Sequence, residues 1–159
     1  MFPKYVNFTA DSLPVAKAEE LADGASSDLD IISSVYNYII THFTYDYSKA
    51  SSVTSGYLPD IDEVFTSEKG ICFDYAALMT AMLRSRDIPC KLQIGYAGDI
   101  KHAWIDVYIR GKGWVEQAIT YDGEKWNRMD PTFTANSEDE ELINSYIGDS
   151  ANYTLQFTR

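Results

Sequence analysis

Three residues of this sequence carry side chains suited to nucleophilic catalysis, and each lies at the end of an expected element. Cys72 begins a strongly helical run, His102 opens an expected strand, and Asp130 closes another. A thiolate can attack a carbonyl carbon, an imidazole can carry the proton to a leaving amine, and a carboxylate can fix the imidazole tautomer. We therefore interpret these residues as a candidate catalytic triad, although their separation along the chain does not show that they meet.

The residues around Cys72 predict a helix that holds the sulfur in its first turn. Gly70 is interpreted as the bend into this helix, and Ala76, Met79 and Leu83 recur at the spacing of a buried helical face. Unpaired backbone N–H groups and the positive end of the helix dipole favour a thiolate at such a position. We expect this helix to be buried and to hold one sulfur in place.

Catalysis at a carbonyl also needs donors for the oxyanion, and the backbone N–H of Cys72 is the first candidate. The sequence does not identify the second donor, for which Tyr45, Tyr47 and Tyr57 are candidates. Tyr45 and Tyr57 are also expected to contact the substrate. Trp104, close to the candidate histidine, is a third substrate-binding candidate that could equally be a strand aromatic packed on the sheet.

Each of these residues also has an ordinary structural interpretation. Most free cysteines are small buried hydrophobes, a strand histidine can simply be hydrogen-bonded, and an aspartate before proline often forms a turn. The sequence leaves open a disulfide between Cys72 and Cys90, although we expect Cys90 to lie in the core. His42, at the end of an expected helix, and Asp74, at the start of another, are interpreted as residues that the helix dipole favours. The alternative for Asp74 is that its charge lowers or raises the reactivity of Cys72.

Three stretches of the chain together resemble the motifs of the transglutaminase-like superfamily. They are Gly70-Ile71-Cys72-Phe73-Asp74-Tyr75-Ala76, His102-Ala103-Trp104 and Asp130-Pro131-Thr132. The segment from Asp87-Ile88-Pro89-Cys90 to Gly95-Tyr96 resembles the link between the cysteine helix and the histidine strand of that family. Asp87 is a departure, because many members have glycine there, and it concerns a turn rather than the triad.

The resemblance implies a papain-like α+β core with a Cys-His-Asp triad and a reaction through an acyl-thioester. Members of the superfamily include protein cross-linking enzymes, peptidases, deglycosylating amidases and inactive relatives. The resemblance therefore leaves open whether water or an amine resolves the thioester. Some transglutaminases use calcium, but the acidic run at 138–141 lacks the ligand spacing of a known calcium loop.

The periodicity of the chain predicts helices first and mostly antiparallel strands afterwards, with the nucleophile helix packed on the sheet. Helices are expected over 13–22, 29–43 (capped by Asp28 or Asp30), 58–67 (started by Pro59), 72–86 and 138–147, with a polar exposed loop over 48–57. Strands are expected over 4–9, 90–97, 102–109, 114–121, 124–130 and 153–157, with Asp122-Gly123 as a hairpin turn. This order defines an α+β fold, which we expect to form a single domain over 1–159.

Composition limits the classes of partner. The chain has 159 residues and a formal net charge of −11, which argues against nucleic acid or an anionic membrane surface as the main partner. No apolar run reaches the length of a membrane span. The two cysteines and two histidines are scattered, so we expect neither a metal site nor an organic cofactor. The oligomeric state and the compartment stay open, with an exported or surface protein and a cytoplasmic one as the alternatives.

These observations predict a cysteine-dependent hydrolase that acts on amide bonds of peptides or proteins. A transglutaminase that joins a glutamine side chain to an amine at the same site is the first alternative. The second is a binding domain that keeps the fold without turnover. The presence of all three candidate triad residues speaks against this last alternative.

Overall fold

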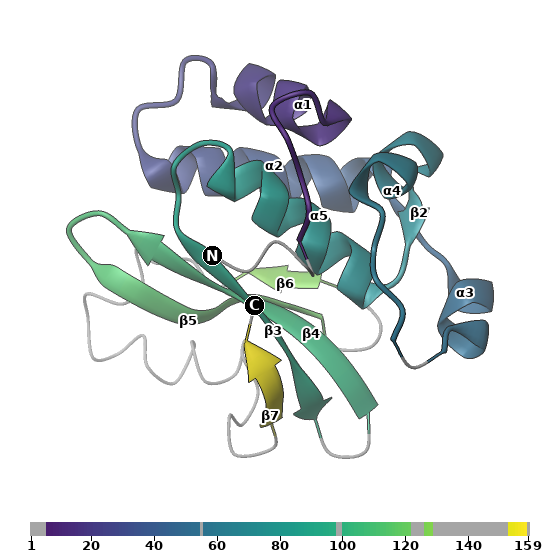
Figure 1. The fold of residues 1–159 in the computed structure, drawn as a ribbon. Helices are drawn as coiled ribbons and strands as arrows, with labels where there is room; N and C mark the ends of the chain where they lie inside the picture. Colours follow the sequence, from purple (N-terminus) through teal and green to yellow (C-terminus); the bar gives the residue numbers. More distant parts are fainter. Residues whose placement is uncertain (1–5, 55, 98–99, 122–125, 129–152, 159) are drawn as a thin grey trace.

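A layer of helices covers one face of a five-stranded sheet in the computed structural model, which describes residues 6–54, 56–97, 100–121, 126–128 and 153–158 (Figure 1). The helices are α1 (Leu13–Ala22), α2 (Asp28–His42), α3 (Tyr47–Ser52), α4 (Ile61–Ser67) and α5 (Cys72–Arg84). The sheet strands are β3 (Cys90–Ala97), β4 (Ile100–Ile109), β5 (Gly113–Tyr121), β6 (Trp126–Arg128) and β7 (Tyr153–Thr158). The predicted α+β class is confirmed.

The strands of the sheet lie in the order β6-β5-β4-β3-β7, and every neighbouring pair is antiparallel. A separate two-stranded parallel pair joins β1 (Thr44–Tyr45) to β2 (Lys69–Gly70), directly before α5. Figure 1 shows α3 and α4 on the side of the molecule where β2 leads into α5. Segments that are distant in sequence therefore meet at the start of α5, the helix that begins at Cys72.

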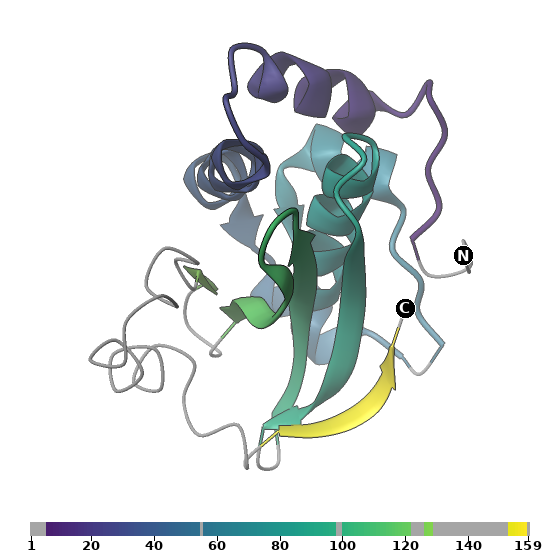
Figure 2. The same cartoon turned by 90° about the vertical axis from the view of Figure 1, so that its left-hand side faces the viewer.

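Helix α5 is the centre of the core. It lies against β3 and β4 on one side and against α1 and α2 on the other, as the turned view in Figure 2 also shows. All ten residues from Asp74 to Leu83 are buried. The predicted apolar stripe of Ala76, Met79 and Leu83 is confirmed, but burial extends around the helix because it is covered from both sides.

The strand register decides which face of β3 and β4 meets this helix. The Cys90 thiol donates a hydrogen bond to the Thr80 carbonyl of α5 at 3.6 Å, and Cys90 pairs with Val107 across the sheet. The pairs Leu92–Ile105 and Ile94–Ala103 therefore also face α5. The opposite face has a polar contact, in which the Gln93 amide donates to the Asp106 carboxylate at 2.7 Å.

The ends of two helices differ in detail from the predictions. Ser27, rather than Asp28 or Asp30, caps α2, and its hydroxyl accepts the Asp30 backbone N–H at 3.2 Å. The two aspartates follow Ser27 within the first turn of α2, where the dipole favours them. Helix α4 begins after Asp60, whose carboxylate caps it, so Pro59 does not start it.

Two further predictions about local structure are wrong. Residues 6–9 form no strand, because a turn follows at once in which the Thr9 N–H donates to the Ser12 hydroxyl at 3.0 Å. The expected exposed loop contains α3, because the Asp46 carboxylate accepts the Lys49 backbone N–H at 2.9 Å and caps a short helix. The helix expected over 138–147 and the turn at Asp122-Gly123 lie outside the described residues.

Candidate active site

Cys72 is the first residue of α5, as predicted, and it is partly buried. The first intrahelical hydrogen bond of α5 runs from the Tyr75 N–H to the Ile71 carbonyl at 3.1 Å. The residue therefore occupies the turn where helix N–H groups point outward and the dipole is positive. This position fits a stabilised thiolate and an oxyanion held by backbone donors.

Glycine is needed at position 70 because of close packing, not because of its backbone conformation. A Cβ on Gly70 would lie 2.8 Å from Asp74 Cβ, which is closer than side-chain atoms pack, and 3.1 Å from Tyr75 Cε1, which is a tight contact. Gly70 also pairs with Tyr45 between β1 and β2, and its carbonyl accepts the Asp46 N–H at 2.8 Å. The glycine thus lets the β1–β2 pair approach the first turn of α5.

Asp74 is a fully buried carboxylate two residues after Cys72. Its Oδ2 accepts the Ile71 N–H at 2.9 Å and contacts Lys49 Nζ at 2.8 Å, while its Oδ1 accepts the Tyr57 hydroxyl at 2.5 Å. Sequence reasoning assigned Asp74 to the helix dipole, with an effect of its charge on the reactivity of Cys72 as the alternative, and did not identify Lys49 at all. No sequence signal indicates this contact, because Lys49 lies in the segment that was expected to be an exposed loop.

The tyrosines near the start of α5 make different contacts. Tyr57 donates its hydroxyl proton to Asp74, and burial, followed by this hydrogen bond, raises the pKa of Tyr57 to about 12. Burial also raises the pKa of Tyr75, whose hydroxyl donates to the Thr44 carbonyl. Tyr45 is half-buried and contacts the exposed ring of Tyr47 at a centroid distance of 4.9 Å. The expected substrate contacts of Tyr45 and Tyr57 stay predictions, as do the oxyanion roles proposed for Tyr45, Tyr47 and Tyr57.

Of the other two candidate triad residues, His102 belongs to an element that the structure describes. His102 belongs to β4, where its backbone pairs with Gly95 of β3, and β4 packs on α5. Asp130 lies outside the described residues. Trp104, two positions along β4, is 5% exposed, which leaves only a small part of its ring for a substrate. The meeting of the three triad side chains therefore stays a prediction.

Cys90 and His42 have the structural roles that were expected of them. Cys90 is 4% exposed in β3, and burial raises the pKa of its thiol to about 12, which keeps it protonated and unreactive. Neither cysteine forms a disulfide, so the alternative of a bond between them is not realised. His42 ends α2, stacks on the Tyr38 ring at 4.4 Å and donates from Nδ1 to the Tyr38 carbonyl at 2.8 Å.

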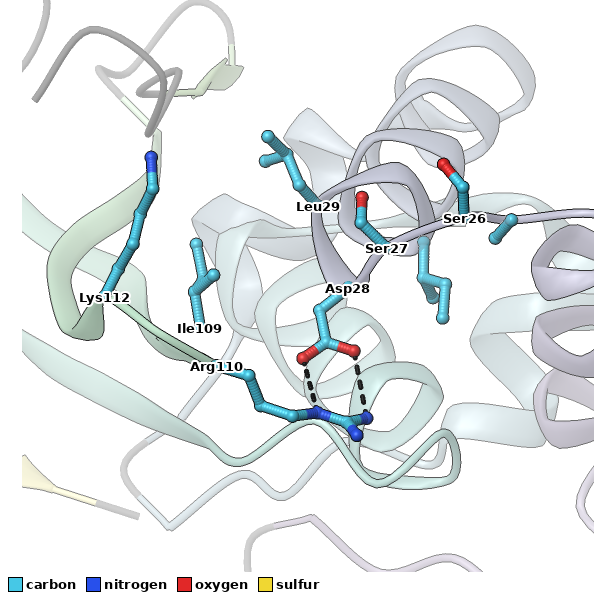
Figure 3. Close-up of a pocket in the computed structure, with 9 residues that line it drawn as sticks. Ser26, Ser27, Asp28, Leu29, Ile109, Arg110 and Lys112 are labelled. Carbon is cyan, nitrogen blue, oxygen red and sulfur yellow. Dashed lines mark hydrogen bonds and ion pairs between the residues drawn. The ribbon is translucent and has the colours of Figure 1, made fainter. Parts of the chain in front are cut away.

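A pocket of about 660 Å³ lies away from Cys72, between the start of α2 and the turn from β4 to β5 (Figure 3). Arg110 and Asp28 face each other there in a two-point ion pair, with distances of 3.0 and 3.1 Å. Ile109 lines the pocket from the end of β4, seven strand steps or about 24 Å from His102. None of the predicted site residues that the structure describes is among the residues lining it.

The described part of the chain contains neither a candidate metal site nor a candidate membrane-spanning helix. Among those residues, no group of three histidine, cysteine or acidic side chains is placed to hold a metal ion. Within the same ranges, none of the helices has both the length and the apolar character needed to cross a bilayer.

Comparison with known proteins gives a family and a fold. The model of the transglutaminase-like superfamily matches residues 15–131. A protein from Cytophaga hutchinsonii proposed to be a cysteine protease is 18% identical, with a TM-score of 0.59, over 98% of this chain and 44% of its own. A TGase is 22% identical, with a TM-score of 0.55, over 89% of this chain and 40% of its own.

The periplasmic domain of TgpA from Pseudomonas aeruginosa is 20% identical, with a TM-score of 0.53, over 84% of this chain and 46% of its own. The chain therefore spans less than half the length of each of these solved structures. A search of curated proteins gives no match. The superfamily match covers most of the chain and includes Cys72 and His102, so this chain belongs to the transglutaminase-like superfamily.

Proposed function

We propose that this protein hydrolyses amide bonds in peptides or proteins, with Cys72 as the nucleophile, His102 as the acid–base and Asp130 as the residue that orients the imidazole. The observation that carries the proposal is the position of Cys72, in the first turn of a buried helix that packs on the strand bearing His102. The helix supplies a rigid support and a favourable field for the thiolate.

The proposed reaction has two halves. The Cys72 thiolate forms a C–S bond to the carbonyl carbon, and collapse of the tetrahedral oxyanion breaks the C–N bond while the His102 imidazolium protonates the leaving amine. Water then attacks the thioester, and His102 accepts its proton. The C–S bond breaks, the product leaves as a carboxylic acid, and the thiolate is restored.

The two cysteines provide an internal comparison for this proposal. Cys72 is partly accessible at a helix N-terminus, whereas Cys90 is buried in a strand and hydrogen-bonded to Thr80. Only the first environment is that of a reactive cysteine. Tyr45 pairs with Gly70 close to Cys72 and contacts the exposed ring of Tyr47, which supports an aromatic wall for the substrate beside the nucleophile.

Hydrolysis and transfer to an amine differ in the molecule that attacks the thioester, and we base the choice of hydrolysis on this difference. Water needs no second binding site, and the neighbour proposed to be a cysteine protease covers nearly the whole of this chain. A transglutaminase would share every step up to the thioester, and a TGase neighbour has the same fold. The two activities therefore differ only in the second half of the reaction.

The test compares variants of the two cysteines and analyses the products of the reaction. We expect the purified protein to cleave members of a quenched peptide library, and Cys72→Ala to lower the rate by at least about a thousandfold while the fold is kept. Cys90→Ala is the matched control and should keep most of the activity. Incorporation of a labelled primary amine into a glutamine peptide would instead indicate transfer, and full turnover by Cys72→Ala would refute the mechanism.

A further inference from the structure

The carboxylate of Asp74 is held in an unusual way for a residue so close to a nucleophile. It is fully buried, and its partners are one backbone N–H, one ammonium and one phenol, from Ile71, Lys49 and Tyr57. A buried charge without partners is very unfavourable, so these contacts are what allow the carboxylate to lie there. The negative charge beneath the first turn of α5 is thus matched by a positive one.

Lys49 comes to this carboxylate from a different part of the chain. It belongs to α3, and its Nζ also lies 4.6 Å from the centre of the Tyr57 ring. The same short helix is tied to the residues before α5, because its cap Asp46 donates its N–H to the Gly70 carbonyl at 2.8 Å. Two independent contacts therefore fix α3 against the start of α5.

We propose that Lys49 is a positioning residue for Cys72, which acts through Asp74 by neutralising its buried carboxylate and holding the first turn of α5 in place. The proposal rests on the proposed function, since it assumes that the Cys72 thiolate is the attacking group. Lys49 itself touches Asp74 and Tyr57 and is assigned no contact with the substrate.

The electrostatic part of this role follows from the sign of the charges. A carboxylate without a counterion, two residues from Cys72, would oppose formation of the thiolate. Burial lowers the pKa of Lys49, but the hydrogen bonds and charges of Asp74 and Tyr57 outweigh burial and raise it above its ordinary value. Lys49 therefore stays an ammonium throughout the pH range in which a thiol titrates, and it cancels the charge of Asp74.

A purely structural role and an electrostatic role predict different results. If the contact between Lys49 and Asp74 only held the helix, removal of either partner would shift the alkylation midpoint of Cys72 in the same direction. If charge matters, Lys49→Met leaves an uncompensated negative charge and Asp74→Asn leaves an uncompensated positive one. The two substitutions then act on the thiolate in opposite directions, and the double variant restores a neutral pair.

The experiment measures the rate at which iodoacetamide alkylates Cys72 in the full chain from pH 5 to 10, with peptide mapping to separate Cys72 from Cys90. We expect the midpoint of this profile to rise by about half a pH unit or more in Lys49→Met, the effect of one uncompensated charge within a helical turn. It should fall in Asp74→Asn, return close to the wild-type value in the double variant, and stay near that value in Lys49→Arg.

The control is Lys17→Met, because Lys17 also forms an ion pair and its side chain is 27% exposed, against 28% for Lys49. The midpoint of the alkylation profile should be the same in Lys17→Met as in the wild type. If Asp74→Asn does not fold, the rise in Lys49→Met and the rescue by Lys49→Arg still decide the question. Single variants that shift the midpoint in the same direction, or not at all, would overturn the proposal.

Failure of this proposal differs from failure of the proposed function. Alkylation requires no turnover, so unshifted midpoints combined with a Cys72→Ala variant that has lost hydrolysis would refute only the role of Lys49. Full hydrolysis by Cys72→Ala would refute the function, whatever the alkylation profiles show.

Discussion

Gly70 lies so close to Asp74 that no side chain fits between them, since a Cβ on Gly70 would be 2.8 Å from Asp74 Cβ. This contact joins the parallel β1–β2 pair to the first turn of α5. The identity of the residue two positions before Cys72 is therefore set by packing against a buried carboxylate, and the backbone of Gly70 does not have a positive φ.

Gly70→Ala should both destabilise the protein and disturb the position of Cys72. The added methyl group must displace Asp74 or Tyr75, both of them buried, and overpacking of this kind costs about 1–3 kcal/mol. We expect a lower midpoint of urea unfolding and slower alkylation of Cys72. Gly24→Ala is the control, because Gly24 has open space around it and a φ of +76°, so that only backbone strain of about 1 kcal/mol is added. That control should leave alkylation unchanged.

Asp87 occupies a position that favours glycine, and its replacement should stabilise the protein. It has a φ of 59° at the end of α5, where its N–H donates to the Arg84 carbonyl and the Ile88 N–H donates to the Leu83 carbonyl, each at 3.1 Å. This is the helix-ending motif in which a left-handed residue is usually glycine. Asp87→Gly should raise the free energy of unfolding by about 0.5–1 kcal/mol, measured by urea denaturation.

Asp87→Ala is the informative control. Alanine in the left-handed conformation is strained like other residues with a Cβ, and it tolerates this conformation less well than aspartate does. The variant should be no more stable than the parent protein. A loss of stability in Asp87→Gly would show that the aspartate side chain makes a contact that outweighs the strain of its backbone.

These observations show which features can be predicted from the sequence. Apolar periodicity predicted α1, α5 and β3 well, because each has an uninterrupted pattern and a clear stop such as Pro89. The start of α2 was placed one residue late, because serine and aspartate compete for the same cap and local sequence does not separate them.

The ion pair of Lys49 with Asp74 could not be predicted, because it joins residues from separate elements and depends on how α3 packs. Local patterns carry no information about such a contact. Cys72 was placed correctly at its helix start, since a glycine followed by a helical run is a local signal. The approach of His102 and Asp130 to Cys72 remains a prediction from the family motifs.

Cys90 should make the stability of the protein depend on alkaline pH. Burial raises the pKa of its thiol from 9.0 to about 12, so above pH 9 the unfolded chain loses this proton while the folded protein keeps it. The stabilising contribution is therefore complete below pH 9 and is lost progressively as the pH rises towards 12. The free energy of unfolding should fall more steeply with pH in the parent than in Cys90→Ala.

The measurement for this prediction is urea unfolding at several values between pH 8 and 10.5. Comparing slopes rather than absolute stabilities removes the cost of the cavity that Cys90→Ala creates. Equal slopes for the two proteins would mean that the thiol titrates alike in the folded and unfolded states, which would contradict its burial in β3.

The central claim is that Cys72 is a thiolate nucleophile activated by His102, and alkylation at pH 6 tests it most directly. Brief treatment with iodoacetamide, followed by intact mass and peptide mapping, should give one adduct located on Cys72 and none on Cys90, which is 4% exposed. His102→Ala should slow this modification by about tenfold or more, because the imidazolium no longer stabilises the thiolate. An adduct on Cys90 alone, or equal rates with and without His102, would contradict the account.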